Sequence, residues 1–292
     1  VEQVPKSRLY KAIRRRITQY NIDVCKFVEE LQGESAVYAN LRSPSHQFWN
    51  DCEIESMIEE LNILGVEQVR PLLLATYDRY YSSDKKRMFK ELLKSVISFT
   101  FRWSTICDLN PNIMEHICSK FAKELRENKI EVNDIVKELR EKAPNDESFI
   151  RSFKAKEFKS GKSRKLARYI LLKVNNYLLA NEGKRELRVD LREINLEHII
   201  PKRPCKKWIK FFKEKNLTNW EYLLYRIGNL TILHKEYNRR ATNKFFTEKK
   251  KIYEQSALPL TKELCKYEEF GPEQVEERSQ RIAEIASNVW RV

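Results

Sequence analysis

The stretch LRVDLREINLEHII, residues 187–200, differs from the segments before it in the period of its apolar side chains. Apolar and polar residues alternate along it, which is typical of a β-strand. A second short strand is predicted at GNLTIL (228–233), and the following KEYNRRATNKFFTEKKKIYEQ returns to helical character. The connection between the two strands contains a helical WEYLLYRI. This order predicts a ββα element within a helical protein.

The segments before residue 186 predict helices, because their apolar residues recur at steps of three and four. Gly65 and Gly183 stand where helices would stop, and DLNPN and KAPNDES predict loops with new helix caps. The strongest candidate for a flexible, basic hinge is KSGKSRK. We therefore expect a mainly α fold, with an α-helical connecting domain over residues 1–185. Residues 186–292 are expected to form a small ββα element with further C-terminal helices.

Composition narrows the class of protein. The 292 residues, 41% of them hydrophobic, are enough to build packed cores. No apolar run approaches the ~20 residues that span a bilayer, and the first residues lack the order of a signal peptide, so we expect a cytoplasmic protein with no membrane partner. The chain begins with Val, which suggests part of a longer or processed protein. Its six cysteines lie far apart, so we expect reduced, mostly buried thiols and no zinc site.

Positive charge is concentrated in one region. The formal net charge is +14, and the excess of Lys and Arg lies between Arg151 and Lys251. Such a field attracts a polyanion, most commonly a nucleic acid; the alternative is a solvated basic surface without a ligand. Aromatic residues are interleaved with these charges, and we expect them in the core rather than stacked on bases. They are Trp208, Phe211, Phe212, Trp220, Tyr222 and Tyr225.

Four polar residues of the ββα element are candidates for a catalytic site. Glu197 and His198 end the first strand, Asn229 opens the second, and Asn238 lies at the start of the helix. Phosphodiester hydrolysis needs a nucleophilic water and cationic stabilisation of the developing charge. Oxygen ligands can hold one divalent ion, and a neutral imidazole can accept the proton of the water. Because adjacent strand residues point to opposite faces, Glu197 and His198 can share a site only if the strand end twists or opens.

The motifs EHIIP, GNLTIL, NKFFTEK and the closing ERSQRIAEIASNVW together resemble the HNH, or ββα-metal, nucleases. The closest resemblance is to the domain at the C-terminus of GmrSD-type restriction enzymes and related phosphorothioate-linked defence proteins, over about residues 186–292. It implies a metal-dependent DNA endonuclease or nickase, the effector part of a bacterial defence protein. In this resemblance His198 is the general base, Glu197 and Asn238 hold Mg²⁺ or Mn²⁺, and Asn229 braces the connecting loop or the His198 ring.

The resemblance also implies partners. DNA is the expected substrate, and the expected protein partner is an N-terminal nucleotide-handling sensor domain, whose glycine-glutamine-glutamine-arginine signature is absent from this sequence. No residue chooses between sugar-modified, sulfur-modified and unmodified DNA. Six basic residues around the motifs are predicted to contact phosphate groups. They are Lys202, Arg203, Lys206, Lys207, Arg239 and Arg240.

Alternatives remain at the level of residues and of function. Asn229 could shape the turn after Gly228, Asn238 could cap a helix, and His234 is a second candidate ligand. Two residues that match the family pattern could be structural, phosphate-contacting or catalytic. They are Asn243 and Lys249. The functional alternatives are a nucleic-acid-binding module with a degenerate nuclease site and a helical scaffold for protein contacts.

Overall fold

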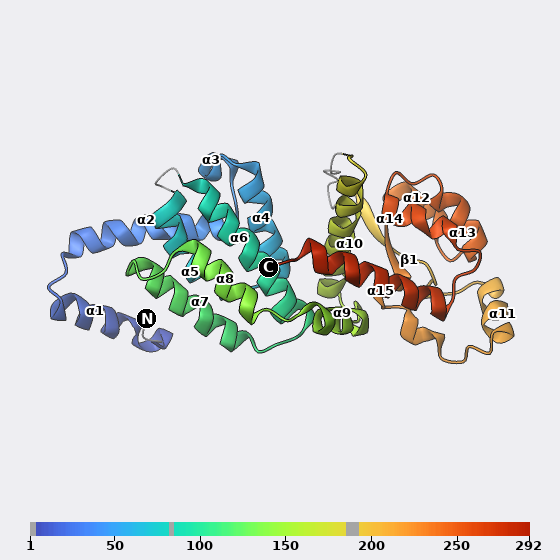
Figure 1. Cartoon of the computed structure of the whole chain (residues 1–292), viewed down its shortest axis with the longest axis horizontal. Helices are drawn as coiled ribbons and strands as arrows, with labels where there is room; N and C mark the ends of the chain where they lie inside the picture. Colours follow the sequence, from blue (N-terminus) through green and yellow to red (C-terminus); the bar gives the residue numbers. More distant parts are fainter. Residues whose placement is uncertain (1–3, 82–84, 185–192) are drawn as a thin grey trace. The chain divides into compact units, whose positions relative to one another are not determined.

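The chain divides into two compact units, Val1–Ala143 with Val292 and Pro144–Arg291. The structure is a computed structural model, and it describes residues 4–81, 85–184 and 193–292 (Figure 1). The domain boundary predicted at 185/186 lies in 185–192, outside the described residues. It stays a prediction about the division of the chain.

The first unit is built from helices (Figure 1). In chain order they are η1 (Lys6–Arg8), α1 (Leu9–Gln19), α2 (Val24–Arg42), α3 (His46–Trp49), α4 (Cys52–Leu64), α5 (Arg70–Thr76), the π-helical η2 (Tyr77–Tyr81), α6 (Lys86–Thr100), the π-helical η3 (Phe101–Ile106), α7 (Pro111–Arg126) and α8 (Val132–Lys142).

Local signals in the sequence explain where several of these helices begin and end. Gly65 adopts a left-handed conformation (φ 71°) at the end of α4, as its position in the sequence predicts. Asn110 accepts a hydrogen bond from the backbone of Asn112 at the start of α7, which confirms the predicted cap in DLNPN. The core of the unit is centred on the fully buried Trp49, whose ring packs against those of Tyr81 and other aromatic residues.

The second unit combines helices with two short strands. In chain order its elements are α9 (Asp146–Ala155), α10 (Gly161–Asn181), β1 (Ile194–His198), α11 (Lys206–Glu214), η4 (Trp220–Leu223), η5 (Ile227–Asn229), β2 (Leu230–His234), α12 (Lys235–Ala241), α13 (Phe246–Tyr253), α14 (Pro259–Lys262), η6 (Glu263–Lys266) and α15 (Pro272–Val289). The mainly α fold and the predicted order strand, helical connection, strand, helix are confirmed.

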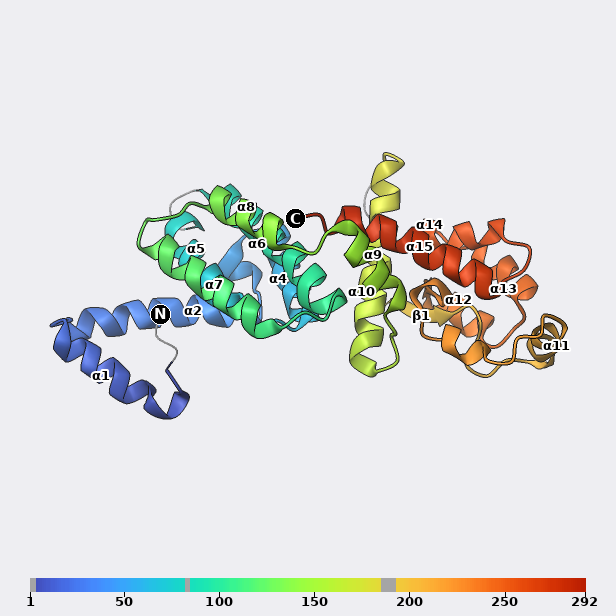
Figure 2. The same cartoon turned by 60° about the horizontal axis from the view of Figure 1, so that its bottom comes forward.

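The two strands pair as an antiparallel two-stranded sheet, called the hairpin below. Ile194 pairs with His234 at one end, and His198 pairs with Leu230 at the other. Helix α10 packs against both strands, and so does α12. In both views the hairpin lies between α10 on one side and α12 with α13 on the other (Figures 1 and 2). The ends of the hairpin are therefore fixed by helices from both sides.

Helix α15 holds the start of β2 in place. Its Arg278 is fully buried and donates hydrogen bonds to the carbonyl groups of Gly228 and Leu230. A Cβ atom at Gly228 would lie 2.0 Å from the carbonyl oxygen of Val275 in α15. Glycine is therefore required here by the close approach of α15, and not by a left-handed backbone.

The helical character predicted after β2 is found in two helices, α12 and α13, which are separated at Thr242, whose φ is 43°. Two expectations from the sequence need correction. KSGKSRK is not a flexible hinge, because the backbone N–H of Ser163 donates to the Ser160 hydroxyl and α10 starts at Gly161. The cysteines are not mostly buried, since Cys25 and Cys52 are exposed and, of the six, only Cys118 is buried.

The aromatic residues of the basic region lie mainly in the core, as predicted. Trp208, Phe211 and Phe212 of α11 are buried in one hydrophobic cluster, and Trp220 and Tyr225 pack against it. Tyr222 is the exception, with 53% of its surface exposed. Among the described residues, no helix is long and apolar enough to cross a membrane.

Candidate active site

A buried carboxylate stands at the end of β1. The Oε1 atom of Glu197 accepts hydrogen bonds from Lys249 Nζ at 2.6 Å and from the Tyr253 hydroxyl at 3.2 Å. Its Oε2 atom lies 3.0 Å from Nδ2 of Asn238, on α12. Lys249 Nζ also donates to the carbonyl oxygen of His198 at 2.6 Å. We call Glu197, Asn238, Lys249 and Tyr253 the Glu197 cluster.

Burial shapes the charges of this cluster. Glu197 is 6% exposed and Lys249 is 0% exposed. Burial raises the pKa of Glu197 and lowers that of Lys249, and the opposite charge of each opposes the shift of the other. Because Lys249 is out of reach of solvent, it does not contact phosphate groups. Of the roles considered for Lys249, its burial favours the structural one.

Asn229 ends η5, directly before β2, and its side chain reaches the loop that follows β1. It is fully buried, its Oδ1 accepts from the backbone N–H of Ile200 at 2.8 Å, and its Nδ2 donates to the carbonyl groups of Ile200 and Leu224. These three hydrogen bonds join the loop after β1 to the segment before β2. The side chain therefore holds the loop, and no hydrogen bond from it to the His198 ring occurs among the described residues.

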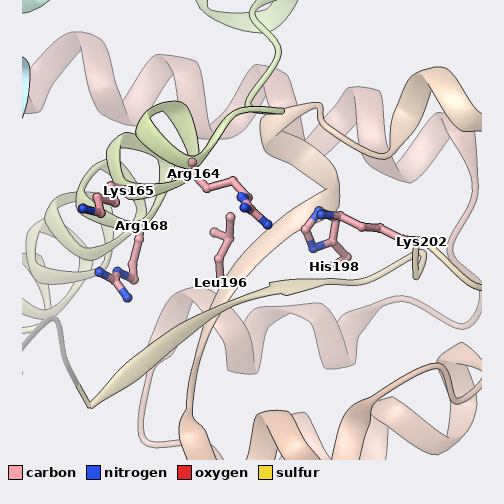
Figure 3. Close-up of a pocket in the computed structure, with 7 residues that line it drawn as sticks. Arg164, Lys165, Arg168, Leu196, His198 and Lys202 are labelled. Atoms are coloured by element: carbon pink, nitrogen blue, oxygen red, sulfur yellow. The ribbon is translucent and has the colours of Figure 1, made fainter.

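His198 belongs to the opposite face of β1. Its ring lines a pocket of about 410 Å³ together with Leu196, two residues earlier (Figure 3). The other described residues that line this pocket are Gly161, Arg164, Lys165 and Arg168 of α10, and Lys202. We call it the basic pocket. Because strand side chains alternate between faces, Glu197 does not line it.

The environment of His198 keeps its imidazole neutral. Burial, together with the positive charges of Lys202, Lys249 and Arg164, lowers the pKa of His198 to about 3. The ring of Tyr225 meets the imidazole edge to face, with 6.0 Å between ring centroids. Nε2 is buried and has no hydrogen-bond partner among the described residues. A neutral imidazole is the form that accepts a proton.

The structure thus brings some of the predicted residues together and separates others. Glu197 and Asn238 are in contact, and His198 is the neighbour of Glu197 in sequence but faces the basic pocket. His198 is the last residue of β1, so both groups lie at the same end of the hairpin. His234 pairs with Ile194 at the other end, which separates it from the Glu197 cluster.

Glu197 and Asn238 are the two residues of the cluster that could hold a divalent cation. Glu197 Oε2 has Asn238 as its hydrogen-bond partner among the described residues, and Asn238 is half-buried, so the cluster is reached from the Asn238 side. A half-turn of the Asn238 amide exchanges the positions of its oxygen and nitrogen, and would place a second oxygen beside Glu197 Oε2. Mg²⁺ binds through one or two protein oxygens and keeps water or phosphate oxygens as its other ligands.

The predicted DNA-contact residues are accessible. Lys202, Arg203 and the other four are exposed, on the loop after β1 and on α11 and α12. Lys207 is paired with Glu248 at 2.5 Å, which offsets its charge. Arg240 lies over the ring of Tyr237 and donates to Gln255 at 3.1 Å.

A separate group of metal-ligating residues lies in the first unit. His46, Cys52 and Glu55 place their ligand atoms within 4.8 Å of one another, and His46 Nδ1 lies 2.7 Å from Glu55 Oε1. His46 and Cys52 are exposed, and Glu55 is partly exposed. Within the described ranges no other such group of three is found. It lies outside the ββα element.

Comparison with protein families finds a match that covers most of the second unit. Residues 143–285 match the model of the C-terminal domain of GmrSD restriction endonucleases. This part of the chain is similar to the GmrSD C-terminal domain. The match begins within one residue of the boundary between the two compact units and contains both the Glu197 cluster and the basic pocket. No curated protein matches the chain.

The match to this domain implies a nuclease role of the restriction-endonuclease type, with DNA as the substrate. Nucleases of this type are typically metal-dependent. The resemblance predicted from EHIIP and GNLTIL is therefore confirmed at the level of the family.

Two parts of the site were not predicted from the sequence. The buried pair of Lys249 with Glu197 depends on the packing of α13 against β1, and the only signal was the position of Lys249 in the NKFFTEK motif. The contribution of α10 to the surroundings of His198 was hidden because KSGKSRK was interpreted as a hinge. The helical spacing of Arg164 and Arg168, four residues apart, is the signal that places them on one face.

Proposed function

We propose that the second unit of this GmrSD-type chain is an HNH-type, metal-dependent DNA endonuclease or nickase. The contact of 3.0 Å between Glu197 and Asn238, which are 41 residues apart, supports the proposal most directly. It joins the carboxylate of the first strand to the amide of the helix, at the same end of the strand as His198. A carboxylate and an amide that can hold a metal ion, at the strand end that also carries an imidazole, suit phosphodiester hydrolysis.

His198 is the proposed general base. In this role the imidazole removes a proton from a water molecule as that water attacks the phosphorus atom in line with the leaving oxygen. The position of the ring in a pocket lined by cations supports this role, because the phosphate that reacts must lie next to the base.

Glu197 Oε2 and the Asn238 amide are the proposed ligands of Mg²⁺ or Mn²⁺. The bound ion would supply positive charge to the phosphate and to the leaving oxygen. Asn229 is proposed to act indirectly, since its hydrogen bonds to Ile200 and Leu224 hold the loop that begins after His198. The role of this chain as the effector of a bacterial antiviral defence protein, working with a nucleotide-handling sensor domain, is part of the same proposal.

A nucleic-acid-binding module with a degenerate nuclease site is the second candidate. The observation that favours it is the ion pair of Lys249 with Glu197, because the ammonium group already offsets the charge that would attract a metal ion. The two candidates differ in one respect. The degenerate module binds DNA without metal and does not cleave it.

Plasmid nicking by the full chain separates the two candidates. The nuclease converts supercoiled plasmid to open-circle or linear DNA with Mg²⁺ or Mn²⁺, and a chelator stops the reaction. A preparation that binds the plasmid but leaves it supercoiled under all these conditions would favour the degenerate module. Because no base-reading motif is evident, we expect modified and unmodified duplexes to be cut at similar rates.

A further inference from the structure

The basic pocket is lined almost entirely by positive charge. It is lined by Arg164, Lys165 and Arg168 of α10 and by Lys202, His198 and Leu196, and the guanidinium group of Arg164 points toward the His198 ring (Figure 3). No Asp or Glu is among the described residues that line it. Its volume of about 410 Å³ is in the range of small-ligand sites.

Two of these charges differ from several basic residues in and directly after α11. Lys207, Lys210 and Lys215 each form an ion pair with a glutamate. Arg164 and Lys202, in contrast, have no ion-pair partner in the part of the chain that the structure describes. Like charges that share a pocket repel one another unless an anion lies between them. The pocket therefore has the charge of an anion site.

The backbone of α10 adds to this potential. Gly161 is the first residue of the helix, and its N-terminal end carries partial positive charge. Positions 161, 164, 165 and 168 share one helical face. A Cβ atom at Gly161 would meet nothing within 4 Å, so the pocket is open at this end.

A hydrogen bond fixes α10 against the strand that carries His198. Arg168 Nη1 donates to the carbonyl oxygen of Ile194, the first residue of β1, at 3.3 Å. Helix and strand also pack against each other directly. The backbone that carries the cations of α10 is therefore fixed beside the strand that carries His198, as a binding site for a reacting group requires.

We propose that Arg164, Lys165 and Arg168 of α10, together with Lys202, bind the phosphodiester group of the DNA strand beside His198. The inference rests on the proposed function in taking DNA as the ligand. Guanidinium groups bind phosphate oxygens through two parallel hydrogen bonds, which favours phosphate over a base as the bound group. The helix that precedes the ββα element thus supplies part of the substrate-binding surface, and binding there is independent of base sequence.

The test uses the full chain carrying His198→Ala, which separates binding from cleavage. Fluorescence anisotropy measures its affinity for an unmodified duplex between 50 and 200 mM salt. Arg164→Gln combined with Lys165→Gln removes two exposed cations of the pocket. Lys162→Gln is the matched control, because it removes one exposed charge from the same turn of α10 without lining the pocket.

The double variant should bind about 10- to 100-fold more weakly at low salt. The negative slope of log K against log salt should become shallower by about 2. Lys162→Gln should stay within about threefold of the parent. Replacing Arg164 by Lys in place of Gln keeps the charge, so the variant Arg164→Lys with Lys165→Gln should recover part of the lost affinity. Melting temperatures equal to that of the parent exclude misfolding of the variants. Equal binding and equal slopes for the double variant and Lys162→Gln would overturn the proposal.

The result is independent of whether the chain cleaves DNA. If the double variant loses binding while the parent with native His198 never cuts DNA, the phosphate site stands and the nuclease proposal fails. If the parent cuts with Mg²⁺ and the double variant cuts and binds like Lys162→Gln, the nuclease stands and the phosphate site fails.

Discussion

Lys249 of α13 donates hydrogen bonds both to the carboxylate of Glu197 and to the carbonyl oxygen of His198, each at 2.6 Å. One buried ammonium group thus connects the two adjacent residues that the proposed chemistry uses. It fixes the end of β1 at the point where the side chains of Glu197 and His198 turn to opposite faces. The pair therefore has a structural role that can be measured apart from activity.

Replacing Lys249 by Met should destabilise the fold by about 3 to 5 kcal/mol, because it leaves the buried Glu197 carboxylate without its cation. The double variant Glu197→Gln with Lys249→Met removes both charges and should recover much of this loss. Urea denaturation measures both free energies of unfolding. If Lys249→Met is as stable as the parent, the ion pair does not hold the strand end.

Replacing Asn238 by Ala should weaken Mn²⁺ binding and abolish cleavage at ordinary Mg²⁺, while the fold persists. Asn238 is half-buried, and its side-chain hydrogen bond goes to Glu197, so little else depends on it. Isothermal titration calorimetry with Mn²⁺ provides the measurement. Asn243→Ala is the control, since Asn243 is exposed on the segment that follows α12. Equal Mn²⁺ affinity in Asn238→Ala and in the parent would transfer the ligand role to another residue.

Glu197→Gln tests the same metal site without removing the side chain from it. The amide keeps the shape of the side chain and an oxygen for Lys249, whereas Glu197→Ala would also leave Lys249 buried and unpaired. We expect Glu197→Gln to bind Mn²⁺ more weakly and to bind DNA as the parent does. Loss of DNA binding with intact metal binding would contradict this assignment.

Replacing Asn229 by Ala should cost about 2 to 4 kcal/mol of stability, because the backbone groups of Ile200 and Leu224 lose their buried partner. Asn195→Ala is the control on the same hairpin, where the half-exposed side chain should change stability by less than about 0.5 kcal/mol. Thermal and urea unfolding report the difference. A stable but inactive Asn229→Ala would instead point to a direct catalytic role.

The exposed basic residues of the second unit should make DNA binding salt-dependent. Affinity should fall steeply between about 50 and 200 mM salt, and neutralising Arg203 and Lys206 should weaken binding to all sequences alike and flatten the slope. Lys210→Gln is the control, because Lys210 is paired with Glu214 on the same helix. Binding that is insensitive to salt, or a sequence-dependent effect of these variants, would argue against phosphate contacts.

Much of the ββα element could be predicted from the sequence, because its signals are local. The alternation before His198 and the glycine and asparagine at 228 and 229 predict two strands, and both form. The sequence suggested that Gly228 belongs to a turn. In the structure glycine is needed at this position because α15, about 50 residues later, approaches the backbone. A contact of that kind leaves no local pattern.

The arrangement of the site could be predicted only in part for the same reason. The contact of Asn238 with Glu197 follows from a family pattern, but the pairing of Lys249 with Glu197 depends on how α13 packs against the hairpin. Placing Arg164 beside His198 requires α10 to lie along the same strand. Tertiary packing of helices selects these neighbours, and helical periodicity alone does not identify the partner of each face.

The most direct test of the central claim is Mg²⁺-dependent nicking of supercoiled plasmid by the full chain and by its His198→Ala variant. The parent should convert plasmid to open-circle or linear DNA with Mg²⁺ and not with a chelator. His198→Ala should fold, bind Mn²⁺ and DNA, and cleave about 10² to 10⁴ times more slowly, the usual size of a general-base effect. His234→Ala, at the other end of the hairpin, should cleave like the parent. Near-normal Mg²⁺-dependent cleavage by a folded His198→Ala protein would contradict the account.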